Sequence, residues 1–200
     1  MELDADAVDA IRELINIGVG RAAGMLNEIT QCPITLKVPS ISIESMEKLT
    51  RILDENVPPL STISLHFKGT MSGVAALVFP QESAALLVTL MTQEDKDAQD
   101  LDVMRIETLK EVGNIIINAV MGSIANVLDQ HLNYSLPRYQ EIRISALAQS
   151  LKESADNRVV LANAHFHLEG TTISGNILLI LEIGSMDALL EGIERMTSRD

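Results

Sequence analysis

The residues best suited to chemistry are two Glu–Asn pairs, one in each half of the chain. Glu13 stands three positions before Asn16, and Glu111 stands three positions before Asn114. In a helix, residues at this spacing are neighbours on one face. A carboxylate can pair with a cation, and a carboxamide carries a donor and an acceptor on one rigid group that can hold a water molecule. Each pair can therefore hold a cation and a water molecule side by side.

Each pair is accompanied by an acidic residue and a proline at fixed distances. The acidic residue stands four positions before the Glu, and the proline follows the Asn after 22 intervening residues. These flanking residues are Asp9 and Pro39 in the first half and Glu107 and Pro137 in the second. Unselected surface residues of two diverged copies should have drifted apart, so the matching Glu and Asn point to function. The prolines fit a structural role at a strand.

The sequence reads as an internal duplication of about residues 4–92 and 102–197. The motif recurs at an offset of 98 positions, and Ser72-Gly73 recurs as Ser174-Gly175 at an offset of 102. An apolar helical stripe, extended in the first copy by Ile15 and Ile29, also recurs. Its matching members are Val8, Ile11, Ala22 and Leu26, and Ile106, Leu109, Val120 and Ile124. In helical projection Glu13 and Asn16 fall opposite this stripe, so both are expected to face solvent.

The pattern predicts the same order of elements in each half: helix, strand, short helix, hairpin and helix. In the first half they are expected at Asp4–Ile29, Leu36–Ile43, Met46–Leu53, the hairpin of Ser61–Lys68 and Met71–Phe79, and Gln81–Met91. In the second half they are expected at Asp102–Asp129, Tyr139–Ile144, Leu147–Lys152, the hairpin of Val159–His167 and Thr172–Ile183, and Ser185–Met196. The acidic stretch Gln93–Asp102 is expected to be an exposed linker.

Neither half carries much core alone, so the sequence predicts one domain over residues 1–200. The expected fold class is α/β of the α+β type. It is an internally duplicated sandwich with one shared, mainly antiparallel six-stranded sheet and two long helices related by a pseudo-twofold axis. Hydrophobic residues make up 46% of the chain and aromatic residues 2%, so aliphatic side chains and methionine must fill the core.

Charge and composition exclude several classes of function. A net charge of −13 with few aromatic residues argues against binding nucleic acid. The longest apolar stretch, Ile115–Leu128, is too short to span a bilayer, and the acidic start lacks the basic segment of a signal peptide. We therefore expect a cytoplasmic protein without membrane insertion. His165 and His167 share one strand face without an evident third ligand, so no metal or cofactor of its own is expected.

The doubled pattern Asp/Ser-x3-Glu-x2-Asn-x22-Pro resembles the signature of the CheC/CheX/FliY family of bacterial chemotaxis phosphatases. In length and duplicated layout the chain is most similar to the CheC branch. The resemblance implies hydrolysis of the aspartyl phosphate on a CheY-type response regulator. It assigns catalytic roles to Glu13, Asn16, Glu111 and Asn114. Glu107 departs from the Asp or Ser of the pattern, which makes the second site the one to question.

In the implied mechanism this chain mainly positions the attacking water and the partner protein, because an aspartyl phosphate is already labile. Each Asn would position the attacking water, and each Glu would orient the partner by pairing with a lysine. Mg²⁺ would belong to the site of the partner regulator. Because each helix carries a complete pair, each is expected to act independently.

Two other functions fit the same helices. The first is a non-catalytic adaptor that binds a phosphorylated regulator and sequesters it. The second is regulation of the receptor deamidase CheD, a partner known for the CheC branch. Neither excludes phosphatase activity.

Overall fold

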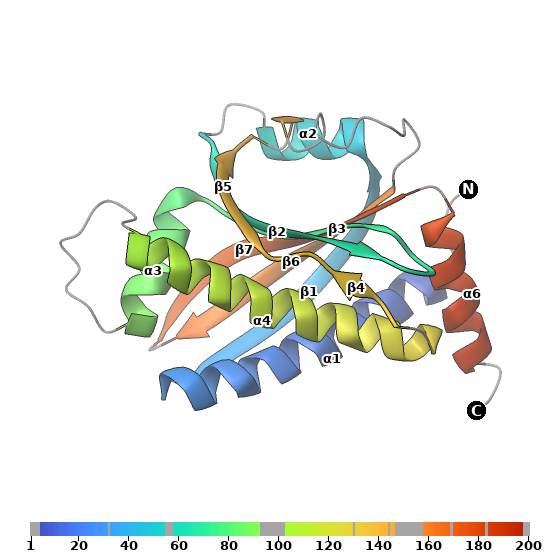
Figure 1. Ribbon diagram of the computed structural model, residues 1–200, viewed down its shortest axis with the longest axis horizontal. Helices are drawn as coiled ribbons and strands as arrows, with labels where there is room; N and C mark the ends of the chain where they lie inside the picture. The colour runs from blue at the N-terminus through green and yellow to red at the C-terminus, as the bar shows by residue number, and fades with distance from the viewer. Residues whose placement is uncertain are drawn as a thin grey trace.

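Two 26-residue helices, α1 (Ala5–Thr30) and α4 (Val103–Leu128), lie side by side and run in opposite directions (Figure 1). The computed structural model describes residues 5–31, 33–54, 58–92, 103–129, 131–143, 145–146, 158–168, 170–182 and 184–197. The two helices cross closely at Gly18, where an added Cβ would lie 2.5 Å from Cα of Val120. A glycine at this point allows the two backbones to touch.

The strands form one sheet in which every pairing is antiparallel. The order across the sheet is β1-β6-β7-β3-β2-β4, and β5 also pairs with β2. The strands are β1 (Ile34–Ser45), β2 (Leu60–Lys68), β3 (Gly73–Phe79), β4 (Asn133–Tyr134), β5 (Arg138–Ile142), β6 (Arg158–Leu168) and β7 (Thr171–Leu181). The mixed α/β class and the antiparallel sheet that the sequence predicts are confirmed.

The two halves of the chain interlock in this sheet. Strand β1 of the first half pairs with β6 of the second, and β5 of the second pairs with β2 of the first. The hairpins β2–β3 and β6–β7 meet through β3 and β7 at the centre. There an added Cβ on Gly73 would lie 2.1 Å from the Ile180 carbonyl oxygen, and one on Gly175 would lie 3.1 Å from that of Val78. The repeated Ser-Gly therefore marks two close backbone approaches, while duplication itself stays an interpretation.

Helices cover both faces of the sheet, but unequally. The larger apolar core lies between one face and α1, α4, α3 (Gln81–Thr92) and α6 (Ser185–Thr197). On the other face a smaller core forms around Leu49 of α2 (Met46–Asp54), the helix above the sheet in Figure 1. No helix in the described ranges is both long enough and apolar enough to cross a membrane.

The expected element boundaries agree with the structure to within a few residues, with one exception at the β2 edge. Within the described ranges seven strands form instead of six, because the edge strand predicted at Tyr139–Ile144 is preceded by the two-residue β4. Between β4 and β5, the amide and hydroxyl of Ser135 bond to the main chain of His66, and Pro137 has no amide hydrogen to donate. The edge is therefore broken in two. The expected helix Leu147–Lys152 and linker Gln93–Asp102 lie outside the described residues.

Candidate functional site

Both motif glutamates are exposed. Glu13 on α1 and Glu111 on α4 have no salt bridge with any residue that the structure describes. The acidic residue one turn earlier is paired in both halves. Asp9 Oδ1 lies 3.0 Å from Arg12 Nη2, and Glu107 Oε1 lies 2.8 Å from Lys110 Nζ.

These two ion pairs occupy the same place in the two halves, three residues apart on an exposed helix face. Each leaves the neighbouring motif glutamate as the carboxylate available to a partner cation. Glu107 therefore makes the same local contact as Asp9, although it departs from the Asp or Ser of the pattern. The doubt about the second site that rested on Glu107 has no support in this geometry.

Asn16 is held by the main chain of β1. Its Nδ2 donates to the Val38 carbonyl oxygen at 3.0 Å, and its Oδ1 accepts from the Val38 amide at 3.0 Å. The pairing of β1 with β6 shifts register between Lys37 and Ser40, beside these bonds. The carboxamide thus satisfies main-chain groups at the irregularity, just before Pro39. The expectation that Asn16 faces solvent is wrong, because it is half-buried on the flank of α1 that meets this strand.

Asn114 has a different partner. Its Oδ1 accepts a hydrogen bond of 2.8 Å from Nδ2 of Asn118, one turn further along α4. Its own Nδ2 has no partner among the described residues. Leu136, which corresponds to Val38, is 85% exposed and makes no bond to Asn114. The second carboxamide is therefore oriented by another side chain and keeps its donor group free.

Glycines leave bare backbone on both long helices. A Cβ added to Gly20, Gly24 or Gly122 would meet nothing within 4 Å, so packing within this chain does not require these glycines. Gly20 stands in the first half where Asn118 stands in the second. Ala23, the small residue before Gly24, is buried and is not part of this surface.

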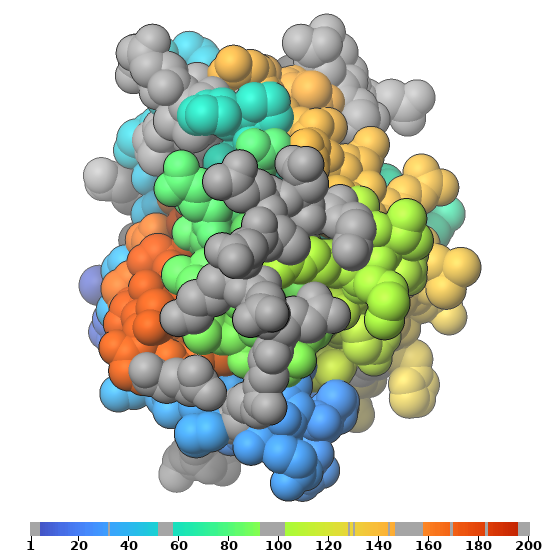
Figure 2. Space-filling view, turned by 90° about the vertical axis from the view of Figure 1, so that its left-hand side faces the viewer, coloured from blue at the N-terminus to red at the C-terminus, as the bar shows by residue number. Residues whose placement is uncertain are grey.

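A pocket of about 480 Å³ lies beside Glu111, where the ends of α1 and α3 meet the start of α4. Figure 2 looks onto this end of the molecule, with α3 in green, α4 in yellow-green and the end of α1 in blue below. The residues that line the pocket include Ile29, which the sequence analysis places in the apolar stripe of the first helix. That assignment is wrong, since Ile29 is 63% exposed. The sequence contains no signal for the pocket, because it is assembled from three helices that are distant along the chain.

His165 and His167 share one face of β6, as the sequence predicts. Their ring centroids are 6.4 Å apart, and Nδ1 of His167 lies 2.9 Å from the Thr172 hydroxyl. Among the described residues, no group of three or more His, Cys, Asp or Glu side chains is placed to hold a metal ion.

Comparison with known proteins finds relatives of the same kind as those that the motif resembles. The chain is 27% identical over 135 residues to the CheY-P phosphatase CheC of Bacillus subtilis, a match that covers 66% of this chain and 65% of that protein's length. It is 19% identical to a CheC1 protein of Halobacterium salinarum, with 96% and 98% of the two chains covered. No family model matches the chain.

Solved structures share the fold at low identity. The structure of FliY from Thermotoga maritima superposes with a TM-score of 0.79 at 18% identity, covering 98% of this chain and 99% of that one. FliM in a FliM–SpeE complex from H. pylori gives 0.72 at 9% identity, covering 97% of each chain. These likenesses establish the fold, which proteins of different names share, so function must be argued from the site.

The doubled motif and the two curated relatives support a likeness to the CheC/CheX/FliY family of chemotaxis proteins, and the solved structures share its fold. Within that family the curated relatives carry CheC names, and this agrees with the branch that the sequence layout favours.

Proposed function

We propose that this protein hydrolyses the aspartyl phosphate of a CheY-type response regulator in the cytoplasm. The observation that carries the proposal is a doubled arrangement, in which a glutamate without an ion pair to any described residue stands one turn before a hydrogen-bonded carboxamide. A partner cation can reach Glu13 or Glu111 from solvent, and the carboxamide then lies about 4.5 Å further along the same helix. The two curated relatives, both named for CheC, support the same substrate class.

The carboxamide would hold water in line with the phosphorus atom. Water positioning suits Asn because one side chain supplies both a donor and an acceptor. The glutamate would act by docking, since a carboxylate aimed at a phosphoryl group would repel it, whereas a lysine beside the phosphate would attract it. In this assignment the chain contributes placement, and the phosphorylation site of the partner contributes Mg²⁺ and charge stabilisation.

The hydrogen bonds of the two carboxamides favour unequal sites. Asn16 has both its oxygen and its nitrogen engaged with Val38, and these bonds would have to rearrange before the side chain entered another protein. Asn114 keeps its Nδ2 group free and is oriented from one side. We therefore assign most of the turnover to Glu111 and Asn114, and a smaller share to Glu13 and Asn16.

The test is phosphate release from a CheY-type regulator phosphorylated with acetyl phosphate. Asn114→Ala should lower kcat on the order of a hundredfold at its site, the usual loss when one transition-state contact is removed. Asn16→Ala should lower total turnover less, and the double variant should have none. Asn126→Ala, which changes an exposed asparagine of the same helix, is the matched control.

Two results would reject the assignment. One is a folded Asn16→Ala/Asn114→Ala variant with undiminished turnover. The other is a wild-type protein that binds the phosphorylated regulator without releasing phosphate, which would favour the adaptor function instead.

A further inference from the structure

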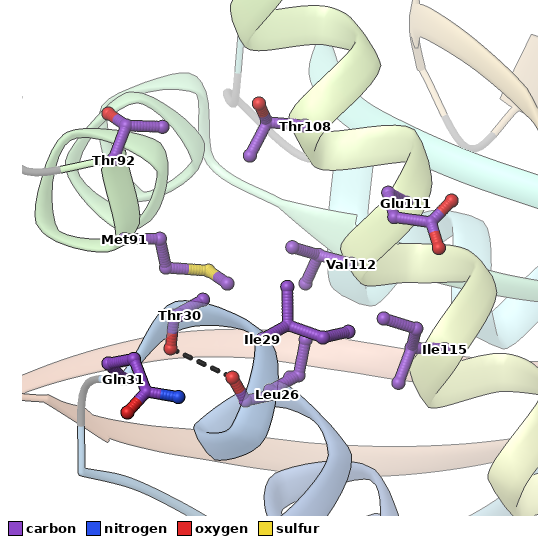
Figure 3. A pocket seen from close by; sticks show the side chains of 10 residues that line it. All are labelled: Leu26, Ile29, Thr30, Gln31, Met91, Thr92, Thr108, Glu111, Val112 and Ile115. Carbon is purple, nitrogen blue, oxygen red and sulfur yellow. Dashed lines mark hydrogen bonds between the residues drawn. The ribbon is translucent and has the colours of Figure 1, made fainter.

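The pocket beside Glu111 has an apolar floor built from three helices. Figure 3 shows Met91 from α3, Ile29 and Leu26 from α1, and Val112 and Ile115 from α4 around the cavity. Four of these side chains are less than 10% exposed, whereas Ile29 stands at the mouth with 63% of its surface exposed. An isoleucine left in water at the rim of an apolar cavity is a surface that a bound group would cover.

Among the described residues at the rim, one charged group has no ion pair. The hydroxyls of Thr30 and Thr92 donate to main-chain oxygens of their own helices, at 2.8 Å and 2.9 Å. Glu111 lines the same rim, and its carboxylate has no ion pair with any described residue. A ligand that fits this pocket therefore carries an apolar group and, beside it, a cation.

The pocket is continuous with the second Glu–Asn pair. Glu111 belongs to both, and Ile115 on the pocket wall directly follows Asn114 in α4. A cation held by Glu111 would lie at the rim of the apolar cavity and one helical turn from the carboxamide of Asn114. A protein that brings a phosphoryl group to Asn114 must therefore place other side chains over the pocket.

We propose that this pocket receives an apolar side chain of the phosphorylated partner protein, adjacent to the cation of that partner that pairs with Glu111. The inference rests on the proposed function for the identity of the partner, and it adds the chemistry by which that partner is chosen. The occupant is a protein segment with an aliphatic or aromatic residue next to a lysine or arginine. The pocket contributes to docking and makes no contact with the reacting atoms, so it acts on KM and leaves kcat unchanged.

The experiment compares two substitutions that leave the net charge unchanged. Ile29→Asn places an amide at the mouth of the pocket, and Met104→Asn does the same on α4 at a residue that is 75% exposed and does not line it. Both residues are largely exposed, so both variants should fold. With a CheY-type regulator phosphorylated by acetyl phosphate, Ile29→Asn should raise KM about tenfold, the size expected for losing the burial of one aliphatic side chain. Met104→Asn and the conservative Ile29→Leu should behave as wild type.

The outcomes separate this inference from the proposed function. Wild-type turnover with an unchanged KM in Ile29→Asn overturns the pocket and leaves the phosphatase. An equal rise in KM for Met104→Asn also overturns it, because the effect then belongs to the whole surface. If the wild-type protein binds the phosphorylated regulator without turnover, the phosphatase assignment falls. In that case a tenfold weaker affinity of Ile29→Asn still supports the pocket.

Discussion

Asn16 and Asn114 stand at the same distance from their glutamates but have different hydrogen-bond partners, and the difference should appear in stability. Asn16→Ala removes two bonds and leaves the main-chain amide of Val38, a buried residue, without its partner. It should cost about 1–3 kcal/mol of unfolding free energy. Asn114→Ala also changes a half-buried residue, but it removes one side-chain contact and leaves no main-chain group without its partner, so it should cost only about 0.5 kcal/mol.

Thermal unfolding of the two variants measures this difference. The first should melt several degrees below wild type, since about 1 kcal/mol corresponds to roughly 2–4 °C in a chain of this size. Equal melting temperatures would show that the Val38 bonds contribute nothing to folding.

Asn118 offers a finer test at the second pair. Its Nδ2 group fixes the orientation of the Asn114 carboxamide, so Asn118→Ala should let that group rotate and lower kcat about twofold, with KM unchanged. Steady-state kinetics in an Asn16→Ala background isolates the second site. A change confined to KM would mean that Asn118 touches the partner directly.

At the scale of single residues, the sequence predicts the solvent exposure of the glutamates well and that of the asparagines only in part. Spacing alone places Glu13 and Glu111 on exposed faces. It does not reveal that Asn16 bonds a strand 22 residues away, because the partner is main chain and has no side-chain identity. In the first half the proline marks the end of that bond, since Pro39 directly follows Val38, but the same interval in the second half comes without a bond between Asn114 and Leu136.

Glycines in α1 allow the packing of elements to be tested with an internal control. Gly18→Ala would drive a methyl group to 2.5 Å from the Val120 backbone, and the two long helices would have to separate. The cost should be about 1–3 kcal/mol of unfolding free energy, as for other overpacked sites. Gly20→Ala, two residues along the same helix, meets nothing within 4 Å and should stabilise the protein by about 0.5–1 kcal/mol.

Chemical denaturation of both variants decides the point. Opposite signs are expected for the same change of residue in one helix. If Gly18→Ala were neutral, the long helices would not be in backbone contact in solution.

Helices and hairpins are predictable from periodicity because each one buries a continuous face of its own sequence. The broken edge formed by β4 and β5 is not. It depends on Ser135 bonding to His66, a contact between residues that are distant along the chain. Long-range main-chain contacts of this kind leave no periodic pattern to detect.

The charge of the whole molecule predicts how docking responds to salt. With a net charge of −13, the protein should attract a partner surface that carries a lysine beside its phosphate. Raising NaCl from 50 to 300 mM, concentrations chosen to shorten the Debye length from roughly 14 to 6 Å, should raise KM several-fold and leave kcat nearly constant. The Glu13→Gln/Glu111→Gln variant should start from a higher KM and respond less. A kcat that falls with salt as steeply as 1/KM would contradict a purely docking role for charge.

The order of strands in the sheet also determines when strand β1 can pair while the chain is being synthesised on the ribosome. Strand β1 emerges early, yet among the described strands it pairs only with β6, so Ile34 cannot pair until Leu168 has been synthesised. At about 5–20 residues per second, that interval lasts on the order of ten seconds. Hairpin β2–β3 can form as soon as it emerges, because its two strands are adjacent in sequence. The edge of β1, by contrast, stays unpaired and can form non-native strand pairings or aggregate. Within the described chain, α1 is the element ready to shield it, because Asn16 and Asn27 already bond its main chain at Val38 and Ile34.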